Sequence, residues 1–154
     1  MLDSVASVLA ELHFQYTEQF LVALLPMAMT VWVHAIGMGA SGRCFRRFTP
    51  HHRRIEHRLL TTTAIVAIML ASHFIEVTLW ALFYVLTGMM PAYKTAMFFS
   101  VNAYTTLGAS NLSLPGRWQG LDGFEAMTAM LMFGWSTALL ASVVQKLHGI
   151  DNVD

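Results

Sequence analysis

The sequence has little charge and almost no cysteine. Only 12% of its 154 residues are Asp, Glu, Lys or Arg, and nine bases and nine acids cancel to a formal net charge of zero. This balance gives no electrostatic reason to expect nucleic acid or another polyanion as a partner. The single cysteine, Cys44, cannot form a disulfide within the chain, and no CxxC or Cys/His motif indicates structural zinc. Motifs of ATPases, serine hydrolases and metalloproteases are also missing, so we expect neither an enzyme nor a cofactor.

Apolar residues are abundant instead. They make up 56% of the chain, and the mean hydropathy is +0.55, both too high for an ordinary soluble domain. Crossing about 30 Å of hydrocarbon takes roughly 20 mostly apolar residues. Three stretches meet this requirement, at residues 19–42, 59–90 and 123–147, and Glu76 is the only Asp, Glu, Lys or Arg near the middle of any of them. The sequence therefore predicts a multi-pass, all-helical membrane protein.

A fourth uncharged stretch, residues 95–116, begins apolar and ends rich in Thr, Ser, Asn, Gly and Pro. Irregular backbone at membrane depth survives only inside protein or along an aqueous cavity. We therefore predict a re-entrant hairpin made of a short helix at 93–104 and a loop at 105–111. The alternative is a fourth complete span.

The placement of the basic residues predicts the orientation. Six of the nine lie in the short loop 43–58, which the positive-inside rule places in the cytoplasm. Residues 1–18, which carry acids and no base, are then an amphipathic segment on the outer surface, and residues 148–154 are a cytoplasmic tail. The clustered arginines are also candidates for binding anionic lipid head groups: Arg43, Arg46, Arg47, Arg53, Arg54 and Arg58.

The order of span, short helix, Thr-Gly loop and span resembles the pore domain of tetrameric potassium channels. The strings SHFIEVTLWALFY, FFSVNAYTTLG and FGWSTALL look like the small bacterial proteins labelled two-pore-domain potassium channel family. The resemblance covers roughly residues 59–147. It implies a homotetramer in a bacterial inner membrane, a central path for monovalent cations, and permeant K⁺ or Na⁺ as the only bound metal.

The resemblance also implies which residues form the ion filter. The family's usual Thr-Thr-Val-Gly-Tyr-Gly-Asp corresponds here to Thr105, Thr106, Leu107, Gly108, Ala109, Ser110 and Asn111. The inner sites of such a filter use the second Thr hydroxyl and the carbonyls that follow. The outer sites depend on the Tyr-Gly pair, which Ala109 and Ser110 do not supply. We therefore expect weakened selectivity for K⁺ over Na⁺, or poor conduction.

Three further residues have more than one interpretation. His73 and Glu76 share one helix face, and an ionisable pair at membrane depth usually faces protein or water. They are interpreted as structural support for the filter, with a metal site or a pH sensor as alternatives; His34 has no carboxylate at a helical spacing. Gly134 is either a gating hinge, as the resemblance implies, or a small residue at a close helix contact.

The sequence thus predicts a cation channel built from three spans and a re-entrant pore helix. Two alternatives remain open. One is a non-conducting or regulatory member of the same family, and the other is a small proton-coupled transporter that uses His73 and Glu76.

Overall fold

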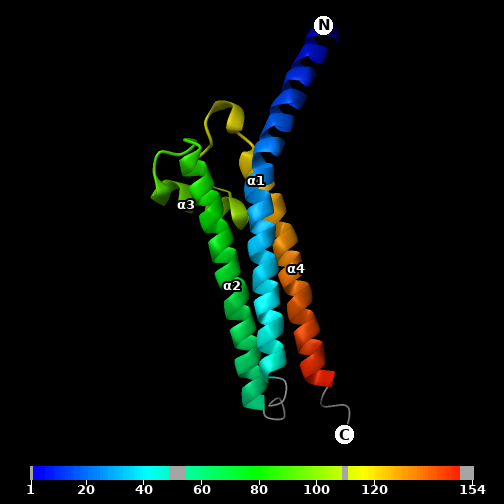
Figure 1. Cartoon of the computed structure of the whole chain (residues 1–154). Helices are drawn as coiled ribbons and strands as arrows, with labels where there is room; N and C mark the ends of the chain where they lie inside the picture. Colours follow the sequence, from blue (N-terminus) through cyan, green and yellow to red (C-terminus); the bar gives the residue numbers. More distant parts are fainter. Residues whose placement is uncertain (1, 49–54, 109–110, 150–154) are drawn as a thin grey trace. The chain divides into compact units, whose positions relative to one another are not determined.

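The computed structural model describes residues 2–48, 55–108 and 111–149. Within these residues the chain forms four α-helices and one short 3₁₀ helix and contains no strand (Figure 1). In chain order they are α1 (Leu2–Phe48), α2 (Ile55–Leu86), α3 (Tyr93–Tyr104), η2 (Gly116–Trp118) and α4 (Leu121–Gly149). The predicted all-helical class is confirmed.

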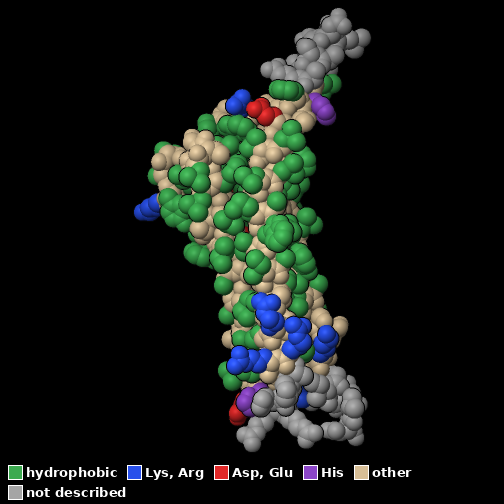
Figure 2. Space-filling view, in the orientation of Figure 1, with side chains coloured by type: hydrophobic (Ala, Val, Ile, Leu, Met, Phe, Trp, Pro, Cys, Tyr) green, Lys and Arg blue, Asp and Glu red, His purple; other side chains and the backbone are tan. Residues whose placement is uncertain are grey.

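Three helical segments of the described chain are long and apolar enough to cross a membrane. They span His13–Phe48, Ile55–Leu86 and Gly116–Leu147. Figure 2 shows apolar side chains over most of the visible helix surface, and many large ones are more than half exposed, such as Trp32, Leu70 and Leu131. Water would not favour such a surface, whereas lipid or further protein would cover it. These features fit a multi-pass membrane protein.

The helix ends differ from the predicted boundaries. Residues 1–18 were expected to be a separate surface segment, but α1 runs without interruption from Leu2 to Phe48 and contains Pro26. No Gly or Pro lies between residues 2 and 25 to end a helix there. At its other end α1 continues six residues past Gly42, because Arg, Cys and Phe allow helix to propagate. α2 stops at Leu86 rather than at residue 90, since Gly88 follows with a left-handed φ of 72°.

The chain divides into two compact units. The first comprises Met1–Met29 and Val77–Ala129, and the second comprises Thr30–Glu76 and Met130–Asp154. The helices α1, α2 and α4 each contribute residues to both units, whereas α3 and η2 belong to the first alone.

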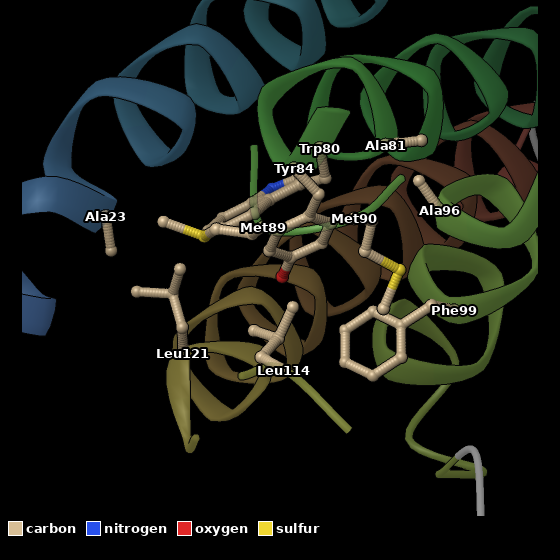
Figure 3. Close-up of a cluster of buried hydrophobic side chains, with 10 residues drawn as sticks. All are labelled: Ala23, Trp80, Ala81, Tyr84, Met89, Met90, Ala96, Phe99, Leu114 and Leu121. Carbon is tan, nitrogen blue, oxygen red and sulfur yellow. The ribbon is translucent and has the colours of Figure 1, made fainter. Parts of the chain in front are cut away.

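The core of the first unit gathers large side chains around Trp80 and Tyr84, both fully buried (Figure 3). Their rings lie 5.9 Å apart, and Phe99 from α3 meets Tyr84 edge-on at 5.5 Å. Tilted and edge-on pairs of this kind stabilise a core beyond their buried area. The remaining members of the cluster are Ala23, Ala81, Met89, Met90, Ala96, Leu114 and Leu121. The cluster fixes α3 against the ends of α2 and α4.

The second unit packs segments of α1, α2 and α4 along one another. Its apolar cluster joins Ile65 of α2 to Val143 and Leu147 of α4, with Cys44 and Phe45 of α1 against them. Gly37 of α1 lies so close to Ser72 of α2 that an added Cβ would overlap the Ser72 side chain. Gly37 therefore allows the two helices to approach closely, as small residues do in membrane bundles.

Replacing Gly37 by alanine is expected to destabilise the protein by about 1–3 kcal/mol, the usual cost of overpacking. The new Cβ would lie 3.0 Å from the Ser72 Cβ, which cannot rotate away. Thermal unfolding in detergent measures the loss. The matched control is Gly39→Ala on the same helix, whose Cβ would meet only Arg43 at 3.5 Å and should be tolerated. Equal melting temperatures for the two variants would refute the close approach.

Candidate functional site

The loop after α3 has an unusual backbone. Thr105 caps the helix with φ −83°, Thr106 follows with φ 61°, and Gly108 has φ 72°. Leu107, between them, is not among the residues with positive φ. Holding Thr106 in the left-handed region costs about 1–2 kcal/mol, which the surrounding structure must supply.

The backbone N–H groups of this loop point back to α3. Thr105 donates to the Val101 carbonyl at 3.0 Å, Thr106 to Ala103 at 3.0 Å, and Gly108 to Asn102 at 3.1 Å. Where φ alternates in sign, successive peptide groups face the same way, with N–H on one edge and C=O on the other. Because the N–H groups of Thr105, Thr106 and Gly108 are used by the helix end, the loop offers carbonyl oxygens rather than N–H groups to a ligand. A row of carbonyl oxygens beside the negative end of a helix dipole suits a cation.

A buried carboxylate of α4 is also bonded to α3. Glu125 of α4 is fully buried and accepts a hydrogen bond from the Tyr84 hydroxyl at 2.7 Å and one from the Ser100 hydroxyl at 2.5 Å. Ser100 also lies 3.0 Å from the Val77 carbonyl of α2. One hydroxyl hydrogen cannot serve both acceptors, but both contacts become hydrogen bonds if Glu125 is protonated and donates to Ser100. The cluster thereby links α2, α3 and α4 within the first unit.

The turn before α4 is fastened to α1. Gln19 is fully buried, and its Nε2 donates to the Arg117 carbonyl at 2.5 Å and to the Gln119 carbonyl at 3.0 Å. Arg117 also pairs with Glu18 at 3.4 Å. These contacts secure η2, the return path of the chain from the loop to α4.

The second unit holds a separate polar cluster. Glu76 of α2 is fully buried, and its two carboxylate oxygens lie 3.0 Å from Nδ1 of His34 and 3.3 Å from Nδ1 of His73. The Ser136 hydroxyl of α4 lies 3.3 Å from Nε2 of His34 and 3.1 Å from Nε2 of His73. The two imidazoles are therefore bracketed by a carboxylate on one side and a hydroxyl on the other.

Two aromatic side chains flank this cluster. The His34 ring lies 5.5 Å from Trp135, and the His73 ring lies 4.7 Å from Phe133. His34 is fully buried and His73 is 12% exposed. All four polar contacts become hydrogen bonds when the cluster carries three N–H protons, that is, one imidazolium balanced by the Glu76 carboxylate. An apolar wall around a neutral network of this kind avoids the cost of an isolated buried charge.

Comparisons with known proteins give no family to name. No family model, curated protein or solved structure matches the chain. The function must therefore be argued from the residues themselves.

The structure places the predicted filter residues as follows. Thr105, Thr106, Leu107, Gly108 and Asn111 are exposed, and Leu107 has 77% of its surface accessible. Ala109 and Ser110 lie outside the described residues, as do Arg53 and Arg54 of the basic loop. Figure 2 shows basic side chains at the end of the second unit where α1 stops, and they include Arg43, Arg46 and Arg47.

The predicted pair His73 and Glu76 lies together as expected from its spacing. His34 has no carboxylate at a helical spacing on its own helix, but Glu76 of α2 pairs with it at 3.0 Å. That partner comes from a different helix, so no spacing within one helix could reveal it. Support of the filter by this pair stays a prediction. Gly134 is exposed near the middle of α4, and a Cβ there would meet nothing within 4 Å in the chain, so no contact within the described chain requires glycine.

Glu125, Ser100 and Tyr84 were not predicted from the sequence as site residues. Tyr84 and Trp80 are of the residue types that often anchor helices at a membrane interface, yet both are fully buried. The signal that was available is the position of Glu125, an acid just inside an apolar run, where an ionisable group needs a partner.

Proposed function

We propose that this chain is the subunit of a homotetrameric channel for monovalent cations. The observation that carries the proposal is the loop after α3, in which a short, half-buried helix ends in a backbone of alternating φ whose N–H groups bond back to the helix. Carbonyl rings that replace the hydration shell are the usual way for a protein to pass a dehydrated cation. The resemblance to potassium-channel pore domains, argued from the sequence, supports the same function.

One loop cannot surround an ion, so the proposal requires several copies. The resemblance implies four. Thr105 to Gly108 are exposed in the single chain, which suits a surface that other copies and the ions would cover. In the tetramer α3 is the re-entrant pore helix and α4 the inner helix. Gly134 on α4 is then available as a hinge.

The proposed orientation follows from the charges. The arginines of residues 43–58 lie in the cytoplasm, the N-terminus lies outside, and the C-terminus is cytoplasmic. Arg43, Arg46 and Arg47 then lie beside the inner leaflet, where each can attract anionic lipid with about 1 kcal/mol. A bacterial inner membrane is the compartment that the resemblance implies.

Cation flux through purified protein in liposomes tests the proposal, with K⁺ and Na⁺ gradients in parallel. We expect flux of both ions, with K⁺ favoured modestly, and a changed ratio of the two in Thr106→Ala. The matched control is Thr17→Ala, because Thr17 is exposed on α1 and bonds only to its own helix at His13. Absence of flux from protein shown to be tetrameric would favour the non-conducting alternative.

A proton-coupled transporter is the second candidate, because Glu76 is buried between two imidazoles. It makes opposite predictions from a channel. Transport should saturate with substrate and collapse in Glu76→Gln, while Thr106→Ala should have no effect. The same liposomes, with a pH gradient in place of the cation gradients, distinguish the two.

A further inference from the structure

We propose that His34, His73 and Glu76 form a binding site for a transition-metal dication of the zinc type. The inference does not depend on the proposed channel function. These three residues were identified separately in the sequence, and the second unit brings one potential ligand atom from each to within 4.8 Å of the others. Two imidazole nitrogens and one carboxylate oxygen are a common ligand set for Zn²⁺ with one position left for water.

The distances between the ligand atoms fit such an ion. Bonds of about 2.0–2.1 Å to a tetrahedral Zn²⁺ place neighbouring ligand atoms roughly 3.3 Å apart. Oε1 of Glu76 lies 3.0 Å from Nδ1 of His34, and Oε2 of Glu76 lies 3.3 Å from Nδ1 of His73. One ligand atom from each of the three residues falls within 4.8 Å of the others, so an ion could take the place of the Nδ1 protons once the side chains close around it.

The other side of each imidazole is already supported. A histidine that binds metal usually donates its second ring N–H to a carboxylate, carbonyl or water, which fixes the ring. Here Nε2 of both rings lies next to the Ser136 hydroxyl, which has two lone pairs to accept with. Trp135 and Phe133 flank the rings and limit water around the site. Direct ligands, their supporting partner and an apolar surround are thus all present in the second unit.

The Glu76 carboxylate lowers the cost of holding a dication at this buried position. With two neutral imidazoles and this carboxylate, the loaded site carries a net charge of +1. Without Glu76 that charge would be +2 in an apolar bundle, which is far more costly. The carboxylate therefore makes the site chemically reasonable where histidines alone would not.

The test is a titration of purified protein, free of any histidine tag, with Co²⁺ and then Zn²⁺. We expect one ion per chain, with the strong visible absorption of tetrahedral Co²⁺ that Zn²⁺ abolishes. His34→Asn, His73→Asn and Glu76→Gln should each weaken binding at least 100-fold. Ser136→Ala should weaken it roughly 10- to 100-fold, the usual effect of removing a supporting partner.

His13→Asn and Cys44→Ser are the controls, because His13 is exposed on α1 and Cys44 lies in a separate apolar cluster. Both should bind Co²⁺ like the parent protein. Loss of binding in a control but not in the three ligand variants would overturn the proposal, as would the absence of any bound ion. If a ligand variant fails to fold, X-ray absorption of the Zn²⁺-loaded parent decides. Coordination of the zinc by two imidazoles and oxygen supports the site, whereas coordination by sulfur, or by oxygen without imidazole, refutes it.

Discussion

Replacing Glu125 by alanine is expected to lower the free energy of unfolding by about 2–4 kcal/mol, since each buried polar group left without a partner costs about 1–3 kcal/mol. The Tyr84 hydroxyl and the Ser100 hydroxyl both bond to this carboxylate. Removing it leaves the tyrosine hydroxyl buried and opens a cavity among α2, α3 and α4. For a chain of this size the loss corresponds to a fall in melting temperature on the order of 10 °C. Thermal unfolding in detergent is the measurement.

The matched control is Glu125→Gln. An amide of the same shape can accept from Tyr84 through its oxygen and donate to Ser100 through its nitrogen, while Ser100 donates to the Val77 carbonyl. We therefore expect Glu125→Gln to stay within about 1 kcal/mol of the parent. A large loss in this variant would mean that the negative charge itself stabilises the unit. An unchanged melting temperature in Glu125→Ala would show that the cluster does not hold α3.

Flux adds a functional measure of the same cluster. Under the proposed function α3 positions the loop, so Glu125→Ala should also reduce discrimination between K⁺ and Na⁺ while Glu125→Gln preserves it. A destabilised protein with unaltered ion discrimination would separate the packing of α3 from the filter.

Much of the helical organisation could be predicted from the sequence because long apolar runs leave few alternatives. The runs predicted at 59–90 and 123–147 appear as α2 and α4, and α3 covers Tyr93–Tyr104, the range expected for the pore helix. The ends of the helices were harder to predict. The predicted spans end where charged residues begin, whereas a helix ends where backbone hydrogen bonding stops. For this reason α1 includes both the acidic residues before the predicted span 19–42 and the arginines after it.

The two polar clusters were predicted only in part. His73 and Glu76 are three residues apart on one helix, so their proximity follows from the helical repeat. His34 and Ser136 join them from α1 and α4, and the partners of Glu125 come from α2 and α3. Contacts between helices depend on the rotation of each helix about its axis. In apolar helices that rotation leaves little trace in the hydrophobic pattern, since nearly every face is apolar.

A substitution in the loop after α3, Gly108→Ala, is expected to have a large effect on flux. The Gly108 φ of 72° is a conformation that alanine adopts only at a cost of about 1–2 kcal/mol, and nothing lies within 4 Å of an added Cβ to clash. Within the single chain the effect of Gly108→Ala is therefore one of backbone conformation. In the proposed tetramer four loops carry the substitution at once, so the total reaches about 4–8 kcal/mol and should abolish flux.

The variant Gly108→Asn distinguishes an effect of backbone conformation from an effect of side-chain size. It adopts positive φ several times more readily than other non-glycine residues, so Gly108→Asn should retain more flux than Gly108→Ala although its side chain is larger. Gly123→Ala is the matched control, because Gly123 lies in the first turn of α4 with open space around its Cβ and should conduct like the parent. If alanine at position 108 conducts as well as glycine, the left-handed backbone is not part of the ion path. If alanine exceeds asparagine, side-chain size rather than φ governs the loop.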